Sequence, residues 1–348
     1  MKQQSIEQHF QVYSGWRQQL FDAIEDFRLW LKDEDIGDAR IDQQLDQVLL
    51  TLRDDKLYVA FVAEFSRGKS ELINAIFFAD YGTRILPSSA GRTTMCPTEL
   101  LYDKDTIPSL RLLPIDTRKN GTTITEYRGF TDEWDEIKLD TKNPKNMIKA
   151  LQHIIEVKTV SIEEARELGF HIVENENELG LQKNEDGLVE IPRWRHAVIN
   201  YPHPLLEKGL VVLDTPGLNA LGSEPELTLN LLPSAHAVLF ILAADAGVTK
   251  SDIDVWHDHI GSGGKTHKGR LVVLNKIDGL WDELKNKGEV EREITRQISQ
   301  TAKTLNMPEA NVYPVSAQKG LLGKVKKDKK ILKRSRLLEL EDALGLEL

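Results

Sequence analysis

The chain has 348 residues, of which 40% are hydrophobic, and a formal net charge of −10. These values fit a globular protein of one large or two moderate domains. They exclude wholesale nucleic-acid binding, because phosphate backbones are held mainly by Lys and Arg. The single cysteine, Cys96, excludes an internal disulfide. A chain with so little cysteine suits a reducing cytoplasm, which is where we expect it. No apolar run approaches the roughly 20 residues of a bilayer span, so any membrane contact should be peripheral or made by sequence outside this chain.

The first predicted element is a long helix over residues 5–32. Its apolar residues recur mostly at three- and four-residue steps and form a stripe that needs a covering partner. They are Phe10, Tyr13, Leu20, Ile24, Phe27 and Leu31. We expect residues 1–53 to form an N-terminal helical segment that precedes the main domain.

Residues 57–63, LYVAFVA, read as a strand buried on both faces, and a helix is predicted over 71–78. Between them stands a variant of the phosphate-binding loop GxxxxGK[ST], in which Ala63 takes the place of the first Gly. In such a loop Lys69 reaches the β- and γ-phosphates of a nucleotide and Ser70 offers its hydroxyl to Mg²⁺. The residues expected around the phosphates are Glu64, Phe65, Ser66, Arg67, Gly68, Lys69, Ser70 and Glu71.

Further strands are predicted over 209–214, 237–244, 270–275 and, more weakly, 311–316, with helices over 250–260 and 284–305. Strands that alternate with helices predict an α/β fold with a mainly parallel, doubly wound sheet. We expect this domain to span residues 54–325. The polar interval of about 103–205 does not continue the pattern and is interpreted as an insertion.

The strand at 209–214 runs directly into Asp214-Thr215-Pro216-Gly217. An acid at this strand end can hold Mg²⁺ through a water molecule, and the N–H of Gly217 can contact the γ-phosphate. The expected metal-binding residues therefore include Asp214 beside Ser70.

The strand at 270–275 ends in Asn275-Lys276-Ile277-Asp278. One carboxylate, Asp278, can accept both N1–H and N2–H₂ of guanine and would reject adenine. Asn275 is expected to tie this loop to the phosphate loop, and the Lys276 stem to lie against the base. Ser316 and Ala317 follow the last strand and are expected to offer backbone N–H groups to the base oxygen.

These four motifs, in this order, resemble the G1, G3, G4 and G5 motifs of GTPases. The segment LPSSAGRTTMCP at 86–97 resembles switch I of the dynamin family, and bacterial dynamin-like proteins in particular. On that register Thr94, with Thr93 as the alternative, is a Mg²⁺ ligand and γ-phosphate sensor. Lys69 and Asp214 stand 145 positions apart, which agrees with the enlarged interval of dynamin G domains. The resemblance implies a GTPase domain with flanking neck helices.

The resemblance also implies GTP and GDP as ligands, Mg²⁺ as cofactor and, through Ser66, a monovalent cation (K⁺ or Na⁺). The expected catalytic residues are Lys69, Ser66, Thr94, Gly217 and Arg67. Two departures concern the attacking water: Phe65 stands where dynamins often carry a Gln, and Leu218 where Ras-like proteins do. Arg67 is interpreted either as an internal arginine finger or as an arginine that faces solvent or pairs with a partner, as mobile loop side chains often do.

Three functions follow from these observations. The first is a dynamin-type GTP hydrolase whose G domains pair with a second copy when nucleotide orders switch I (86–98) and switch II (214–225). Its membrane contact would come from regions outside this chain. The second is a ribosome-associated GTPase of the Era type, which the long interval and the acidic charge disfavour. The third is a GTP-binding switch or scaffold that hydrolyses poorly.

The C-terminal end carries the run KGLLGKVKKDKKILKRSR over 319–336, with nine basic residues and one acid, Asp328. It is interpreted either as a solvated face or as a patch for an anionic lipid or acidic partner. A helical stretch with Leu337, Leu338, Leu340 and Leu344 follows. We expect residues 326–348 to begin a C-terminal neck that is truncated, because the chain stops while still apolar.

Overall fold

The computed structural model describes residues 6–34, 41, 45, 49, 56–87, 96–170, 172, 183–184, 186–215, 232, 235–260, 269–281 and 286–346. The chain divides into two units. One consists of Met1–Leu57 with Asp342–Leu348, and the other of Tyr58–Glu341. The domain boundaries expected from the sequence at 53/54 and 325/326 remain predictions.

The smaller unit contains helix α1 (Ile6–Asp33), in agreement with the periodicity of residues 5–32. On this helix the rings of Phe27 and Trp30 are stacked with their centroids 5.9 Å apart. Among the described residues, none of the helices combines the length and the hydrophobicity that a bilayer span needs.

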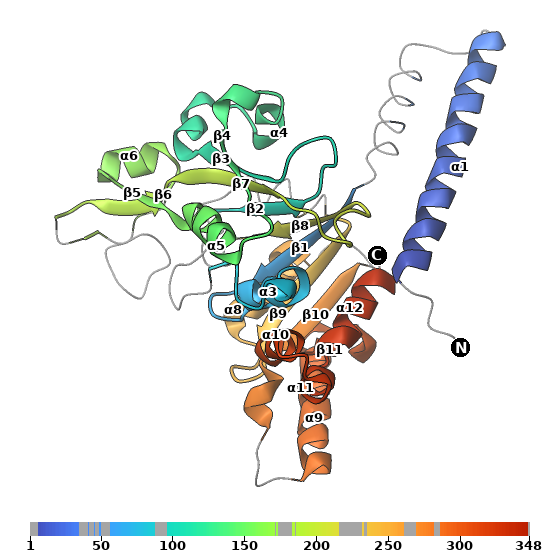
Figure 1. The fold of residues 1–348 in the computed structure, drawn as a ribbon, viewed down its shortest axis with the longest axis vertical. Helices are drawn as coiled ribbons and strands as arrows, with labels where there is room; N and C mark the ends of the chain where they lie inside the picture. The colour runs from blue at the N-terminus through green and yellow to red at the C-terminus, as the bar shows by residue number, and fades with distance from the viewer. Residues whose placement is uncertain are drawn as a thin grey trace. The chain divides into compact units, whose positions relative to one another are not determined.

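The larger unit is built on one nine-stranded sheet with the order β11-β10-β9-β1-β8-β2-β7-β3-β4 (Figure 1). Strands β1, β9, β10 and β11 pair in parallel, as predicted for a doubly wound α/β fold. Their bounds, with β8, are β1 (Leu57–Ala63), β8 (Leu210–Asp214), β9 (Ala237–Ala243), β10 (Arg270–Asn275) and β11 (Val312–Pro314).

Both faces of the parallel strands are covered. Side chains alternate between the two faces of a strand, and one set in β1, β9 and β10 packs with Trp256, Ile294 and Leu305 from the helices behind the sheet. On the other face α3 and α10 pack side by side (Figure 1). The helices are α3 (Lys69–Phe77), α8 (Lys250–Val255) with a π-helical turn (Trp256–Ile260), α9 (Lys287–Leu305) and α10 (Ala317–Val325).

Strand β2 and the interval from 103 to 205 extend the sheet. Strand β2 pairs antiparallel with β8 and parallel with β7, and β3 lies between β7 and β4. The strands are β2 (Thr98–Leu101), β3 (Ser109–Pro114), β4 (Asp135–Lys138) and β7 (Trp194–Asn200), with the helices α4 (Ile124–Tyr127), α5 (Pro144–Gln152) and α6 (Ile162–Glu167). A two-stranded ribbon, β5 (Val157–Val160) and β6 (Val189–Pro192), has a small core of its own with α6.

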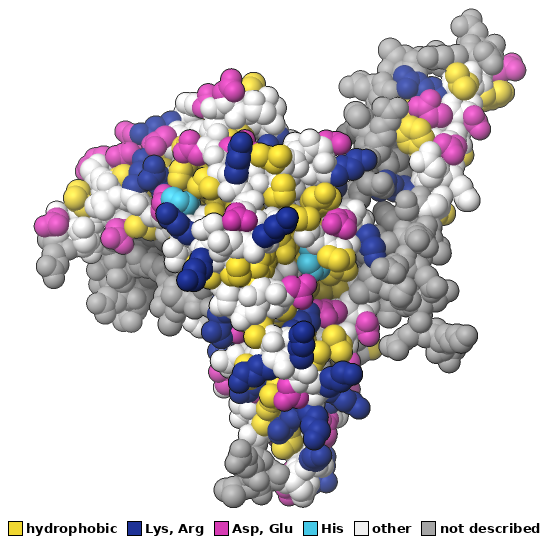
Figure 2. All heavy atoms as spheres, viewed as in Figure 1, with side chains coloured by type: hydrophobic (Ala, Val, Ile, Leu, Met, Phe, Trp, Pro, Cys, Tyr) yellow, Lys and Arg dark blue, Asp and Glu magenta, His cyan; other side chains and the backbone are white. Residues whose placement is uncertain are grey.

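The basic run near the C-terminus folds into helices. Helix α10 is followed by α11 (Lys329–Ser335) and α12 (Leu337–Leu346). Gly320 and Gly323 permit this close packing: a Cβ atom on Gly320 would lie 2.7 Å from Leu337 Cδ2, and one on Gly323 would lie 2.7 Å from the backbone N of Leu332. Figure 2 shows Lys and Arg side chains gathered over α9, α10 and α11, whereas acidic and basic side chains are interspersed over the insertion.

Candidate functional site

The loop between β1 and α3 has the backbone of a phosphate-binding turn. Ser66 and Gly68 both have positive φ angles, 62° and 91°, and α3 begins at Lys69. A Cβ atom on Gly68 would lie 2.4 Å from Asn275 Nδ2, so only glycine fits this position. The first-turn N–H groups of α3 therefore face the loop, in the arrangement that binds anions at helix N-termini.

Lys69 and Asp214 form a buried ion pair at the carboxyl ends of β1 and β8. The Lys69 Nζ and Asp214 Oδ1 atoms are 2.6 Å apart, and both side chains are less than a tenth exposed. The contact is an ion pair that does not meet hydrogen-bond geometry. Neither atom has a hydrogen-bond partner among the described residues. A buried ammonium and a buried carboxylate with unused bonding capacity fit a phosphate and a hydrated Mg²⁺, respectively.

The side chain of Arg67 is buried against helix α8. Its Nη2 atom lies 2.9 Å from Asp252 Oδ2 and 3.2 Å from Glu64 Oε2, and it donates to the Thr249 hydroxyl at 3.4 Å. Asp252 is fully buried and also accepts the N–H and the hydroxyl of Thr249, which caps α8. This geometry corrects the expectation of an internal arginine finger, because Arg67 is held by acids of its own domain.

The first residues of the loop divide between anchored and exposed side chains. Glu64 accepts from Arg67 and from the Ser251 hydroxyl, so it belongs to the same network. Phe65 is 38% exposed and Ser66 is exposed beside it. The network therefore fixes the backbone on both sides of an exposed aromatic side chain.

Asn275 joins the three motif loops, as expected. Its Nδ2 donates to the Arg67 carbonyl oxygen at 2.9 Å, and its Oδ1 accepts from the Ala317 N–H at 3.0 Å. The side chain is almost fully buried between these partners. One amide thus holds the phosphate loop against the turns that follow β10 and β11.

Asp278 and Ser316 lie together at the end of the site predicted for the base. The Ser316 hydroxyl donates to Asp278 Oδ1 at 2.6 Å and accepts from the Lys319 N–H. The Ser316 N–H donates to the Ser335 carbonyl, and the Ala317 N–H is taken by Asn275. The expected supply of these two N–H groups to a base oxygen is therefore wrong: Ser316 positions Asp278, and Ala317 positions Asn275.

Lys276 adopts the left-handed conformation with φ 62°, which turns the chain sharply between Asn275 and Asp278. Its Nζ lies 3.3 Å from Asp245 Oδ2, and the side chain is 39% exposed. The stem of Lys276 thus stands at the surface beside Asp278, where a planar base has access.

Two side chains of α3 hold the segment that leads into the predicted switch I. Arg84 makes a two-pronged contact with Glu71, with distances of 2.6 and 2.7 Å, and these hydrogen bonds raise the pKa of Arg84. One helical turn further on, the buried Asn74 accepts from the N–H groups of Ile85 and Leu86 and donates to the Leu86 carbonyl. The sequence analysis missed both contacts, since neither pair forms a known motif.

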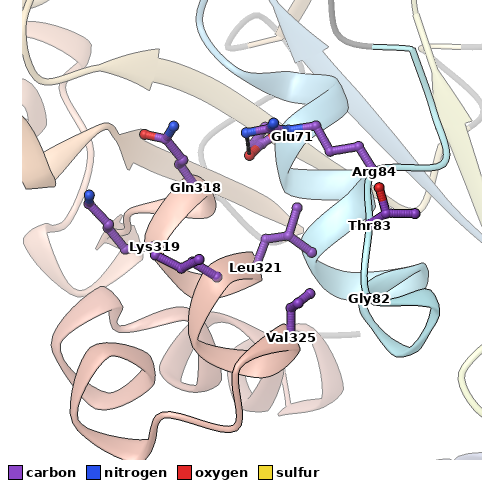
Figure 3. Close-up of a pocket in the computed structure, with 9 residues that line it drawn as sticks. Glu71, Gly82, Thr83, Arg84, Gln318, Lys319, Leu321 and Val325 are labelled. Atoms are coloured by element: carbon purple, nitrogen blue, oxygen red, sulfur yellow. Dashed lines mark hydrogen bonds and ion pairs between the residues drawn. The ribbon is translucent and has the colours of Figure 1, made fainter.

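The Glu71–Arg84 pair borders a pocket of about 330 Å³ between α3 and α10 (Figure 3). Its walls include Thr83, Gln318 and Lys319, and its floor is apolar. Glu71 follows Ser70 directly and Gln318 follows Ala317 directly, so the pocket adjoins both the phosphate loop and the turn after β11. Its mixture of an apolar floor and a polar rim is typical of ligand sites.

Several predicted residues lie outside the described part of the chain: Thr93, Thr94, Gly217 and Leu218. The last residue of the predicted switch I, Thr98, and the first of the predicted switch II, Asp214, are described. They stand opposite each other on the paired strands β2 and β8. Cys96 is 1% exposed, and burial raises the pKa of its thiol. A thiol in that environment stays protonated and behaves as a small packed residue.

Comparison with known proteins identifies the family to which this chain belongs. A model of the dynamin family matches residues 59–277, which include the phosphate loop and Asn275. The chain belongs to the dynamin family. This membership favours the dynamin interpretation over the Era-type one, and it implies a guanine nucleotide, usually with Mg²⁺.

Two relatives show how low the sequence identity within the family is. A bacterial dynamin-like protein of Nostoc punctiforme is 23% identical over 256 residues, which are 73% of this chain and 29% of the relative. Dynamin-like protein A of Bacillus subtilis is 22% identical over 295 residues, 78% of this chain and 23% of the relative. The chain therefore spans less than a third of the length of either relative.

Solved structures agree in fold. The bacterial dynamin GTPase LeoA of ETEC superposes with a TM-score of 0.51 at 13% identity, over 99% of this chain and 45% of that one. A member of an oligomerised bacterial dynamin pair gives 0.51 at 18% identity, over 100% and 53%. At this identity the likeness shows the dynamin G-domain fold and no more.

Proposed function

We propose that this chain binds GTP with Mg²⁺ and hydrolyses it as the GTPase part of a dynamin-like protein. The observation that carries the proposal is the convergence of the motif loops: Asn275 hydrogen-bonds to Arg67 of the phosphate loop and to Ala317 after β11. Lys69 of the same phosphate loop pairs with Asp214, at the start of the remaining motif. Each loop follows a strand at the same edge of the sheet, where ligands of doubly wound folds bind.

At the phosphate end, Lys69 would contact the β- and γ-phosphates together with the N–H groups of the loop. Ser70 and Asp214 would hold Mg²⁺, which neutralises the charge of the bridging phosphate oxygens when it is bound. Lys69 and Asp214 are buried and lie 2.6 Å apart, so the cation for the phosphates and the carboxylate for Mg²⁺ stand side by side. The protein supplies positioning and charge rather than covalent chemistry.

At the base end, Asp278 would accept the two donors of guanine, with Lys276 along one face. The 2.6 Å hydrogen bond from Ser316 fixes one oxygen of Asp278 and so orients the carboxylate. The pocket between α3 and α10 begins beside Gln318, which follows Ala317, and its apolar floor would offer a surface to the nucleoside.

The positioning of the attacking water rests on residues that remain proposals. Thr94 and Gly217 would contact the γ-phosphate and the water, and the hydroxyl of Ser66 would help to hold a K⁺ or Na⁺ ion. The exposed Phe65 offers no hydrogen bond to a water molecule. That observation favours a second candidate, a GTP-binding switch that hydrolyses slowly.

We also propose that two G domains meet across their nucleotides and that hydrolysis moves the neck helices. One solved structure similar to this chain comes from an oligomerised bacterial dynamin pair, which supports assembly in general and leaves the G-domain contact as our proposal. Membrane remodelling would require regions that the longer relatives possess.

The test is GTP turnover by this chain at increasing protein concentration, with Lys69→Ala as the inactive control. Specific activity that rises with concentration supports a dimerising hydrolase. Tight GTP binding with flat, near-zero turnover would contradict hydrolysis and leave the switch.

A further inference from the structure

Lys319 of the basic run lines the pocket between α3 and α10, and the other eight cations separate into two groups once the run is folded. Three of them contact the domain itself: Lys324 donates to the Ala75 carbonyl and pairs with Glu341, Arg336 pairs with Glu291, and Arg334 lies 4.1 Å from the ring centroid of Trp281. Five others have exposed side chains without a hydrogen bond or ion pair to any described residue. These are Lys326, Lys327, Lys329, Lys330 and Lys333, which we call the lysine face.

Three lysines of the lysine face lie on one side of α11, and Lys326 and Lys327 precede them in the turn between α10 and α11. Helical geometry places Lys329, Lys330 and Lys333 on one arc of α11, while Leu332 and Ser335 turn towards α10. The close approach at Gly323 fixes α11 against α10, and Asp328 caps α11 through the N–H groups of Lys330 and Ile331. The single acid of the run is therefore engaged by the backbone, and the face keeps its positive charge.

This concentration of charge contrasts with the rest of the chain, whose net charge is −10. Exposed charges normally alternate in sign or pair with neighbours, as they do over the insertion (Figure 2). Five like charges within eight residues repel one another and are stabilised by an anionic partner.

The chemistry of the face identifies the kind of partner. All five cations are lysines, which act as point charges and lack the fork that binds one phosphate in two-pronged fashion. None of the exposed large hydrophobic side chains of the described residues lies between 317 and 336, so bases of single-stranded nucleic acid find no stacking platform there. A surface of mobile anionic headgroups requires neither feature.

We propose that the lysine face docks this domain onto a bilayer that contains anionic lipids. The contact is electrostatic and superficial, with no inserted side chain. It is independent of nucleotide binding, because the face shares no residue with the site at the carboxyl ends of the strands.

The experiment is flotation of the full chain with vesicles of phosphatidylcholine alone and of phosphatidylcholine with phosphatidylglycerol. We expect binding only to the second kind, weakening as salt is added. The triple variant Lys326→Gln, Lys330→Gln, Lys333→Gln should bind roughly 100-fold more weakly, at about five-fold for each lysine near an anionic surface.

The matched control is Lys138→Gln, Lys145→Gln, Lys149→Gln, which removes three exposed lysines from the insertion. It changes the net charge equally and should leave vesicle binding within about three-fold. GTP turnover should be unchanged in both triples.

Equal loss in the two triples would mean that overall charge, not this face, drives binding, and it would overturn the proposal. So would failure of the unmodified chain to float with anionic vesicles. The same result follows if the first triple releases the chain from RNA while vesicle binding persists, since the partner would then be nucleic acid.

Discussion

The two sides of the phosphate loop carry similar charges in different surroundings. At its exit, Lys69 meets one carboxylate, Asp214, at 2.6 Å and has no further hydrogen bond to the described residues. At its entrance, Arg67 meets Asp252, Glu64 and Thr249, all tied to the capped start of α8. Both cations are buried and stand two positions apart, yet Arg67 Nη2 has three protein partners, whereas Lys69 Nζ has a single counter-ion.

This difference shows how the phosphate loop can be held rigidly at one end and still bind a ligand at the other. The ion pair at the exit has partners that a phosphate and a metal ion can replace. The network at the entrance pairs Arg67 with two acids of its own domain and holds the backbone that presents Phe65 and Ser66. We therefore expect substitutions at the exit to affect turnover and those at the entrance to affect stability.

The largest effect is expected from Lys69→Ala. Loss of the cation that faces the phosphates should lower GTP turnover by about 1,000-fold, the scale of removing one preorganised charge or donor. Ser70→Ala keeps the Lys69–Asp214 pair and should instead raise the Mg²⁺ concentration needed for half-maximal turnover. Turnover assays over a Mg²⁺ series, with circular dichroism to verify folding, distinguish the two; turnover of Lys69→Ala within ten-fold of the unmodified chain contradicts the assignment.

Arg67→Ala is expected to act mainly on stability. It leaves the fully buried Asp252 without its cation, which should lower the free energy of unfolding by about 3 kcal/mol. Asp252→Asn should couple to it in a double-mutant cycle measured by denaturant unfolding. An arginine finger would behave in the opposite way, with turnover reduced by roughly 1,000-fold or more and no loss of stability.

A smaller effect is expected from Gly68→Ala, with Gly82→Ala as its matched control. Both glycines have positive φ angles, 91° and 71°, but a Cβ atom meets Asn275 Nδ2 at 2.4 Å only at Gly68. The control should cost about 1 kcal/mol of unfolding free energy for the backbone conformation alone. Gly68→Ala should cost about 2 kcal/mol more, because the clash displaces Asn275; equal costs would show that Asn275 moves away freely.

The smallest effect on stability is expected from Phe65→Ala. A side chain that is 38% exposed contributes little to the core, so unfolding should change by less than about 0.5 kcal/mol. If the exposed face of the loop meets a second copy, the dependence of turnover on protein concentration should weaken in this variant. An unchanged concentration dependence would exclude Phe65 from that contact.

The sequence predicted the parallel half of the sheet well and the other half poorly. Strands β1, β8, β9 and β10 are buried on both faces and appear as continuous apolar runs. Strand β4 reads DEIK and is largely exposed, and β2 has only four residues, TELL, so neither has a pattern that periodicity can detect. Their places in the sheet depend on pairing between segments that are distant in the sequence.

The same limit applies to the site. The motif residues were identified because each motif is local. The contact between Arg67 and Asp252 joins positions 185 residues apart, and nothing near Arg67 indicates it. The use of the Ser316 and Ala317 N–H groups depends on where Ser335 and Asn275 lie in three dimensions, which no local pattern records.

The most direct test of the account is the base selectivity of Asp278→Asn. We predict that affinity for GTP falls by about 10- to 100-fold, through the loss of a hydrogen bond to a charged group. Affinity for xanthosine triphosphate should rise, because xanthine offers an acceptor where guanine offers its amino group and the new amide supplies a donor. Titration of both nucleotides against the two proteins decides the question. Unchanged GTP affinity, with no gain for the xanthine nucleotide, would contradict the placement of guanine at Asp278.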